Sequence, residues 1–290
     1  MPAPNDSLFE RFLAPLVNTI LVDKEAAREL NQKIDWLRLL PIHRNSGVVY
    51  PNYYQHDYHG FSGGYLSDTT AVTYDSLVPS LLPPNESLVR QGLMDAIRCY
   101  PRRILDLGCG TGSMTMMLHQ KFPDAEVIGL DLSPYMLVVA DYKQQSKHRH
   151  TFTVQWMHGN AASVSLPSES IDLVTASLLF RDIPATVSQT IIREAFRLLT
   201  PGGELVILDG NQSALRHATW LTQFSQEPYI QSYAKASIDQ WLESVGYGDI
   251  HTHDWWWLHQ VTRGVKPVSA TKQWDMPINS RFESDGWVPA

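Results

Sequence analysis

The sequence predicts an α/β protein whose core is a mostly parallel sheet with helices on both faces, ending in an antiparallel hairpin. Three observations carry this prediction. Short apolar segments alternate with segments of helical spacing between residues 87 and 266. One apolar segment runs directly into the glycine-rich sequence GCGTG at 108–112. Near the end, two extended segments at 248–257 and 258–265 follow one another with a very short link, which only antiparallel neighbours allow.

The individual elements follow in order along this central region. Strands are predicted at 103–107, 125–131, 153–157, 171–177 and 204–209, and helices at 88–97, 112–122, from Ser133-Pro134 onward, at about 186–199 and at about 236–246. Ser133 is a good N-cap and Pro134 fits a first helical turn. Strand, helix and strand at this spacing form parallel βαβ units.

Three regions differ in character. Residues 1–86 are predicted to form a helical extension with an aromatic lid, 87–266 the ligand-binding α/β domain, and 267–290 a polar C-terminal tail. The lid is the segment from Tyr50 to Tyr65, which concentrates tyrosines, histidines and glycines. Glycines permit motion and aromatic rings exclude water, so we expect this segment to close over a ligand site.

Composition narrows the classes of function. The chain has 290 residues, 43% of them hydrophobic and 18% charged, which is typical of a folded protein. Its net charge of −7 disfavours nucleic acid as a partner. Two cysteines exclude a disulfide scaffold. With no obvious signal peptide and no apolar segment of ~18 residues, we expect a cytoplasmic protein without membrane spans. The oligomeric state stays open.

The glycine loop predicts a ligand site. Gly108, Gly110 and Gly112 have G-x-G-x-G spacing, whereas a dinucleotide fingerprint requires G-x-G-x-x-G and position 113 is Ser. Asp106 precedes the glycines and would repel a pyrophosphate but attract an ammonium group. A nicotinamide dinucleotide is therefore disfavoured.

Polar residues at two further strand ends define the rest of this ligand. Asp131 ends the second strand, where a carboxylate can accept both ribose hydroxyls. Asn160 follows the third strand and can hydrogen-bond an adenine edge, while Leu132 and Met136 supply apolar walls for the purine. A ligand with a ribose, an adenine and an amino-acid ammonium group is S-adenosylmethionine.

The chain resembles the class I S-adenosylmethionine-dependent methyltransferases, in the branch of the ubiquinone and menaquinone biosynthesis methyltransferases. The resemblance rests on four motifs in order: ILDLGCGTG (104–112), VIGLDLSPYML (127–137), HGNAASVSLPSESIDLVTAS (158–177) and LLTPGGELVILD (198–209). It implies a Rossmann-like seven-stranded sheet in the order 3-2-1-4-5-7-6.

The resemblance also implies a role for each matching residue. The residues that would hold the cofactor are Asp106, Gly108, Cys109, Gly110, Gly112, Asp131, Leu132, Met136, Asn160, Ala161 and Ser177. Asp106 would orient the amino-acid part, Asp131 would hold the ribose, and Ser177 would lie near the sulfonium. Position 160 departs from the family, which usually has Asp there; Asn retains a carbonyl acceptor for the adenine amino group.

The predicted function is in-line methyl transfer to a small metabolite. Aromatic residues in the N-terminal region and at Trp220, Phe224, Tyr229 and Tyr233 indicate an apolar or ring-bearing acceptor. If the acceptor carries an acidic proton, a base must take it. His56, His59, Tyr65, Asp209 and His217 are candidates; His59 and Tyr65 are preferred as the catalytic residues because the lid should face the methyl group.

Other interpretations were weighed. Asp182, Asp209 and Asn211 resemble the oxygen ligands of a magnesium-dependent site, and His251, His253 and His259 a zinc site, but loop polarity and half-exposed sheet histidines explain them more simply. No metal is therefore predicted. Trp255 and Trp257 are expected on one strand face and Trp256 on the other. A peptide or protein methyltransferase, or a non-catalytic cofactor-binding protein, are the alternative functions.

Overall fold

A computed structural model describes residues 24–55, 64–81, 85–147, 154–217 and 228–268. Seven strands in these residues form one sheet in the order β3-β2-β1-β4-β5-β7-β6, which confirms the predicted fold class. Their bounds are β1 Arg103–Leu107, β2 Glu126–Asp131, β3 Val154–His158, β4 Ile171–Ser177, β5 Leu199–Gly210, β6 Gly248–Trp255 and β7 His259–Val265. Strands β1 to β5 pair in parallel, and β7 runs antiparallel to both β5 and β6.

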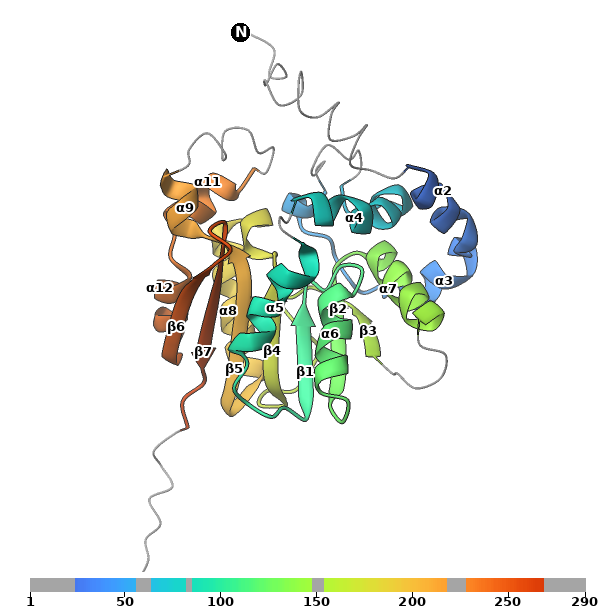
Figure 1. The fold of residues 1–290 in the computed structure, drawn as a ribbon. Coiled ribbons are helices and arrows are strands. Elements are labelled where there is room, and N and C mark those ends of the chain that lie inside the picture. Colours follow the sequence, from blue (N-terminus) through green and yellow to red (C-terminus); the bar gives the residue numbers. More distant parts are fainter. Residues whose placement is uncertain (1–23, 56–63, 82–84, 148–153, 218–227, 269–290) are drawn as a thin grey trace, which may run out of the picture.

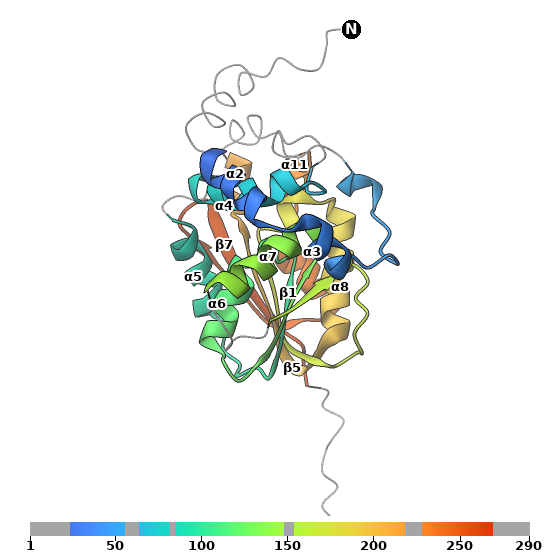
Figure 2. The same ribbon diagram turned by 90° about the vertical axis from the view of Figure 1, so that its right-hand side faces the viewer.

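The helices are α2 Lys24–Lys33, α3 Trp36–His43, α4 Asp68–Leu81, α5 Glu86–Ala96, α6 Ser113–Lys121, α7 Pro134–Lys147, α8 Ala185–Leu198, α9 Gln212–His217, α11 Ile230–Lys235 and α12 Ile238–Val245, with short 3-10 turns η3 Asn52–Tyr54 and η4 Phe180–Asp182. Helices α5 and α6 cover one face of the sheet and α8 the other (Figure 2). Helix α12 packs with α8 on this second face. None of the helices in the described part of the chain is long and apolar enough to cross a bilayer.

Both faces of the sheet carry an apolar layer because the central strands are buried on both sides. Strand β1 shows the pattern: Ile104 points to the layer under α5 and α6, and Leu105 to the layer under α8. Each is fully buried. The parallel register brings the carboxyl ends of β1, β2 and β4 to one edge of the sheet.

The hairpin at the C-terminal end differs from the predicted one at its tip. Trp256 and Trp257 lie in the turn, with φ of 45° and 33°, so Trp257 does not share a strand face with Trp255. The prediction extended the strand by two residues because a run of tryptophans favours extended backbone. Trp255 packs against Gly92 of α5, where an added Cβ would lie 2.7 Å from the indole.

The N-terminal elements lie over the carboxyl edge of the sheet. Helix α4 contacts α2 and α7, and α3 contacts α7 (Figure 1). Ala71 and Val72 of α4 and Val139 of α7 are buried in this third apolar cluster.

Candidate functional site

The main pocket opens at the carboxyl ends of β1, β2 and β4, the edge at which open α/β sheets bind ligands. The space between its walls is ≈ 760 Å³ when the open mouth is included. The pocket is lined by Tyr53, Tyr54, Tyr65, Tyr74, Gly108, Gly110, Leu130, Asp131, Leu132, Met136, Gly159, Asn160, Ala161, Ser177, Leu178, Leu179, Asp182, Ile183 and Ile191. Of the predicted cofactor residues, eight line this pocket: Gly108, Gly110, Asp131, Leu132, Met136, Asn160, Ala161 and Ser177.

The glycine loop joins β1 to α6 through backbone that other residues rarely adopt. Gly108, Gly110 and Gly112 have φ of 64°, 53° and 80°, all in the left-handed region. Gly112 precedes the first residue of α6 and does not line the pocket; an added Cβ there would lie 2.5 Å from Trp156. Gly112 therefore serves the turn and its packing, whereas Gly108 and Gly110 form the pocket floor.

Asp131 fixes the loop from the neighbouring strand. One carboxylate oxygen accepts a hydrogen bond from the Gly110 amide at 2.7 Å and the other from the Ser133 amide at 2.8 Å. Burial raises the pKa of Asp131 to about 6, although these amide bonds work in the opposite direction. A buried carboxylate at the pocket wall is suited to accept hydroxyl donors such as those of a ribose.

The next part of the wall is the loop after β3. Leu132 and Met136 are buried beside it, and Asn160 and Ala161 line the pocket. The side-chain oxygen of Asn160 accepts a hydrogen bond from the Ala162 amide at 2.9 Å. It therefore retains one lone pair for a ligand, and its amide group adds donors.

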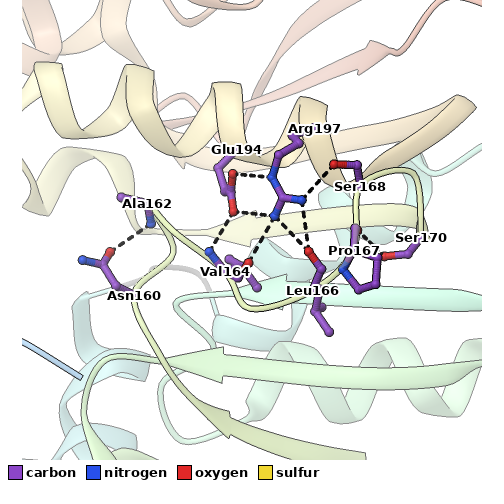
Figure 3. Close-up of polar contacts among 9 residues, drawn as sticks. All are labelled: Asn160, Ala162, Val164, Leu166, Pro167, Ser168, Ser170, Glu194 and Arg197. Atoms are coloured by element: carbon purple, nitrogen blue, oxygen red, sulfur yellow. Dashed lines mark hydrogen bonds and ion pairs between the residues drawn. The ribbon is translucent and has the colours of Figure 1, made fainter. Parts of the chain in front are cut away.

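Arg197 of α8 holds the loop after β3 in place through hydrogen bonds to its backbone (Figure 3). Its guanidinium donates to the carbonyls of Val164 and Leu166 and pairs with Glu194, whose pKa it lowers. The Val164 amide donates back to Glu194 at 2.7 Å. The position of Asn160 thus depends on a network centred more than thirty residues further along the chain.

A polar recess continues from the pocket beneath the glycine loop. It shares Tyr74, Gly108, Gly110 and Ser177 with the main pocket and adds Arg90, Asp106, Cys109, Thr111, Ser113 and Met114. Asp106 is 1% exposed, and its two oxygens accept hydrogen bonds from Thr115 at 2.6 Å and Thr175 at 2.8 Å. Burial raises its pKa. Since both oxygens have partners in the chain, Asp106 also has a structural role: it links β1 to Thr115 of α6 and Thr175 of β4.

Arg90 was missed by the sequence reasoning. It lies on α5, is 6% exposed, donates to the Ser177 hydroxyl at 2.8 Å and pairs with Glu86 at 2.8 Å. The available signal was its helical position, because Arg90 precedes the buried Leu93 and Met94 by three and four residues and so shares their face. An arginine on the buried face of a helix is a candidate for binding an anionic group.

Tyr54, Tyr65 and Tyr74 line the pocket on the side of the N-terminal region, and Tyr50 stacks on Tyr54; we call these four residues the tyrosine roof. The rings contact one another in sequence: Tyr50–Tyr54 at 6.4 Å, Tyr54–Tyr65 at 6.0 Å and Tyr65–Tyr74 at 6.3 Å between centroids. The Tyr65 carbonyl accepts a hydrogen bond from Ser133 at 2.6 Å. The preferred catalytic residue Tyr65 therefore lies in the pocket wall, whereas His56 and His59 lie outside the described residues.

The roof contacts η4, the short turn after β4, through a hydrogen bond between Tyr65 and Asp182. The Tyr65 hydroxyl donates to Asp182 at 3.1 Å, and Arg181 lies 3.7 Å from the same carboxylate. Asp182 is 9% exposed and lines the pocket together with apolar side chains, including Ile183 and Ile191. A carboxylate in an otherwise apolar wall is suited to accept a proton or a hydrogen bond from a ligand.

The remaining base candidates lie elsewhere. Asp209 is fully buried, does not line the pocket, and accepts hydrogen bonds from the Phe180 and Gly210 amides; burial raises its pKa to about 6. His217 is exposed at the end of α9. Tyr233 is buried and donates to the Gly210 carbonyl, and Trp220 and Phe224 lie outside the described residues.

The side chains considered for a metal do not form such a group. Among the described residues no cluster of three His, Cys, Asp or Glu could hold a metal ion. Asn211 caps α9 through the Ala214 amide, and His251 and His253 are exposed on β6 whereas His259 is buried on β7.

The residues present fit S-adenosylmethionine. The main pocket offers a buried carboxylate and apolar walls for a nucleoside, and the recess offers Arg90 and Asp106 for a zwitterionic amino acid. Gly108 and Gly110 line both the main pocket and the recess, and they leave room for the part of the ligand that joins the nucleoside to the amino acid. Fold and site together are similar to those of class I S-adenosylmethionine-dependent methyltransferase domains.

Comparison with known proteins agrees. The family described as "Methyltransferase domain" matches residues 104–203. The chain is similar to the demethylmenaquinone methyltransferases of Thermus thermophilus (35% identical over 114 residues, 39% of this chain and 50% of that protein) and of a Geobacillus species (36% over 115 residues, 39% and 47%). The chain thus matches about half the length of these relatives.

Solved structures show the same fold at low sequence identity. Human N-acetylserotonin methyltransferase in complex with S-adenosylmethionine is 15% identical, with a TM-score of 0.54 over 70% of this chain and 58% of that one. A phosphoethanolamine N-methyltransferase of Haemonchus contortus is 17% identical, with a TM-score of 0.53 over the same shares.

Proposed function

We propose that this protein transfers the methyl group of S-adenosylmethionine to a small, ring-bearing or apolar metabolite. One observation carries the proposal: the pocket that includes Asp131 and the glycine loop is also lined by Tyr53, Ile183 and Ile191. Cofactor and acceptor would therefore share one space beneath the tyrosine roof. Such a covered space favours a metabolite over a peptide, which needs an open groove.

Several side chains would hold the cofactor. Asp131 would accept the ribose hydroxyls, Asn160 would bond the adenine edge, and Arg90 would pair with the amino-acid carboxylate. When bound, S-adenosylmethionine supplies an electrophilic methyl group on a sulfonium. The chain contributes by aligning the acceptor with that group and by excluding water, which accounts for much of the rate in such displacements.

The Tyr65–Asp182 pair is the proposed proton acceptor. An acceptor hydroxyl that displaces the Tyr65 hydroxyl from Asp182 would deliver its proton to the carboxylate as the methyl bond forms. The Arg181 guanidinium, 3.7 Å from this carboxylate, places a positive charge beside it. Tyr65→Phe and Asp182→Asn should each lower kcat while binding of S-adenosylhomocysteine persists.

The relatives provide the first acceptor to test. Because two of them are named demethylmenaquinone methyltransferases, a naphthoquinol without a substituent at the position next to its ring oxygen is the natural probe. Calorimetry should detect binding of S-adenosylhomocysteine and none of NADH. Labelled methyl transfer to the naphthoquinol, compared with transfer to a mixed peptide library, then separates metabolite from peptide acceptors. Failure to bind S-adenosylhomocysteine would refute the proposal.

A further inference from the structure

His158 has no role in the cofactor site described above, yet it makes buried polar contacts beside it. It is the last residue of β3, lies opposite Asp131 in the strand register, and is 6% exposed. Its Nδ1 lies 2.9 Å from the backbone amide of Asn45, and its Nε2 lies 3.0 Å from the carbonyl oxygen of Leu132. These two contacts join a segment before η3 to the pocket wall.

The two partners decide which ring nitrogen carries the proton. A backbone amide can only donate, so Nδ1 must accept the bond from Asn45. A carbonyl can only accept, so Nε2 must carry the hydrogen that is donated to Leu132. His158 is therefore neutral, in its Nε2–H form, whenever this arrangement exists.

His158 also anchors the first ring of the tyrosine roof. The Tyr50 hydroxyl lies 3.3 Å from Nε2, and the two ring centroids are 5.9 Å apart. Tyr50 stacks on Tyr54 with an interplanar angle of 9°, and Tyr54 contacts Tyr65. A continuous series of ring contacts thus runs from His158 to the hydrogen bond between Tyr65 and Asp182.

We propose that His158 is a positioning residue that holds the tyrosine roof over the cofactor pocket and does so only while its imidazole is neutral. This proposal rests on the proposed function and adds a regulation of the same site. A proton on Nδ1 would face the Asn45 N–H, leaving two donors opposed in a buried place. The roof would then separate from the pocket wall, and cofactor affinity would fall.

The charged groups around His158 do not compensate for such a proton. Burial lowers the pKa of His158, and Arg44, next to Asn45, adds to this effect because it opposes a positive charge on the imidazole. Tyr50 is neutral because its burial raises its pKa. The Asp131 carboxylate is occupied by the Gly110 and Ser133 amides, and Asp141 of α7 pairs with His43.

The direction of the pH effect follows from this lowered pKa. With the roof closed, burial lowers the pKa of the imidazole below its ordinary value of ~6.5, and opening of the roof would remove part of that burial. The closed roof is thus fully stable above pH ~6.5 and loses stability as the pH falls below that value. Between the pKa values of His158 in the closed and open states, each fall of one pH unit weakens cofactor binding by up to about tenfold.

The test is calorimetric titration of the full chain with S-adenosylhomocysteine between pH 5 and 8. His158→Asn keeps an acceptor near the Nδ1 position but does not titrate, so it should bind a few-fold more weakly at pH 7.5 and show a shallower decline in acid than the native protein. His251→Asn, on the exposed strand β6, is the matched control and should follow the native profile. Asp131 titrates in the same range in every variant, so the difference between profiles isolates His158.

Nitrogen-15 spectra of the histidine rings give an independent readout. In the complex at pH 7.5 the His158 ring should show the Nε2–H form and should resist protonation to a lower pH than in the free protein. Identical pH profiles for native protein and His158→Asn, or an Nδ1–H ring in the complex, would overturn the proposal. Thermal melts at pH 5 and pH 8 show whether His158→Asn folds. If it does not fold, the nitrogen-15 spectra of the native protein alone test the proposal. Absence of binding by native protein at pH 7.5 would instead refute the proposed function.

Discussion

Substitution of Gly112 by alanine tests the account of the glycine loop most directly. Two separate costs are expected. Alanine at a φ of 80° is strained by about 1–2 kcal/mol. Its Cβ would also lie 2.5 Å from the Trp156 ring and 3.1 Å from the Ala140 Cβ, an overpacking that costs about 1–3 kcal/mol more. Gly112→Ala should therefore lower the free energy of unfolding by about 2–5 kcal/mol.

Gly110→Ala is the matched control. Its φ of 53° imposes the same strain, but its Cβ would meet only Tyr74, at an ordinary contact distance of 3.7 Å. Gly110→Ala should therefore cost only about 1–2 kcal/mol. Trp156→Phe removes the outer part of the indole and should recover the steric share of the Gly112→Ala cost when the two are combined.

Urea unfolding followed by far-ultraviolet circular dichroism gives the free energies of unfolding of the native protein, Gly112→Ala, Trp156→Phe and the double variant. These can be compared if the dependence of the free energy on urea concentration is the same for all four. The reasoning is wrong if Gly112→Ala costs no more than Gly110→Ala. It is equally wrong if Trp156→Phe and Gly112→Ala are strictly additive, because the ring would then not be the obstacle.

Three further substitutions test the site. Arg90→Met should weaken S-adenosylhomocysteine binding about tenfold or more in calorimetry, since a charged hydrogen bond is lost. Arg38→Met, on the surface of α3, is the control and should bind as the native protein does. Equal affinities of Arg90→Met and the native protein would show that Arg90 does not belong to the site. Because the pKa of Asp131 is raised to about 6, the free protein should gain stability from this group as the pH falls from ~6 toward ~4, while cofactor affinity, which needs the carboxylate, falls over the same range. Asp131→Asn should remove this stability gain in melts and make the decline in affinity shallower in titrations, leaving the part assigned to His158. Profiles identical to those of the native protein would contradict the assignment. Arg197→Leu should weaken cofactor binding and lower the free energy of unfolding, measured in urea, by about 2 kcal/mol. Arg193→Leu, on the exposed side of α8, is the control and should do neither. Unchanged cofactor binding in Arg197→Leu would show that the position of the Asn160 loop does not depend on Arg197.

Much of the fold could be predicted because its signals are local. Strand β4 was predicted with its observed bounds, as was β1, since each is a short apolar run bounded by polar residues. The hairpin tip was mispredicted because three tryptophans favour extended backbone, whereas the turn there is set by how Trp255 packs on α5.

The candidate site was predictable only in part. The residues from Gly108 to Gly112 and Asp131 lie at strand ends, and the parallel arrangement alone brings such ends together. Arg90 was missed because one charged residue in an amphipathic helix has no distinctive local pattern. Asp182 was considered only as a metal ligand, because its contact with Tyr65 spans 117 residues of sequence.

The sequence by itself determined the strand and helix segments, the backbone conformation of the glycine loop and the kind of ligand that its flanking carboxylates accept. These properties depend on residues close together in the chain, where side-chain alternation and the steric freedom of glycine suffice. Only the tertiary structure decided three hydrogen bonds: from Tyr65 to Asp182, from Arg90 to Ser177, and from the Asn45 amide to His158. Such contacts join distant segments, and their geometry is set by the packing of whole helices against the sheet, which no local pattern encodes.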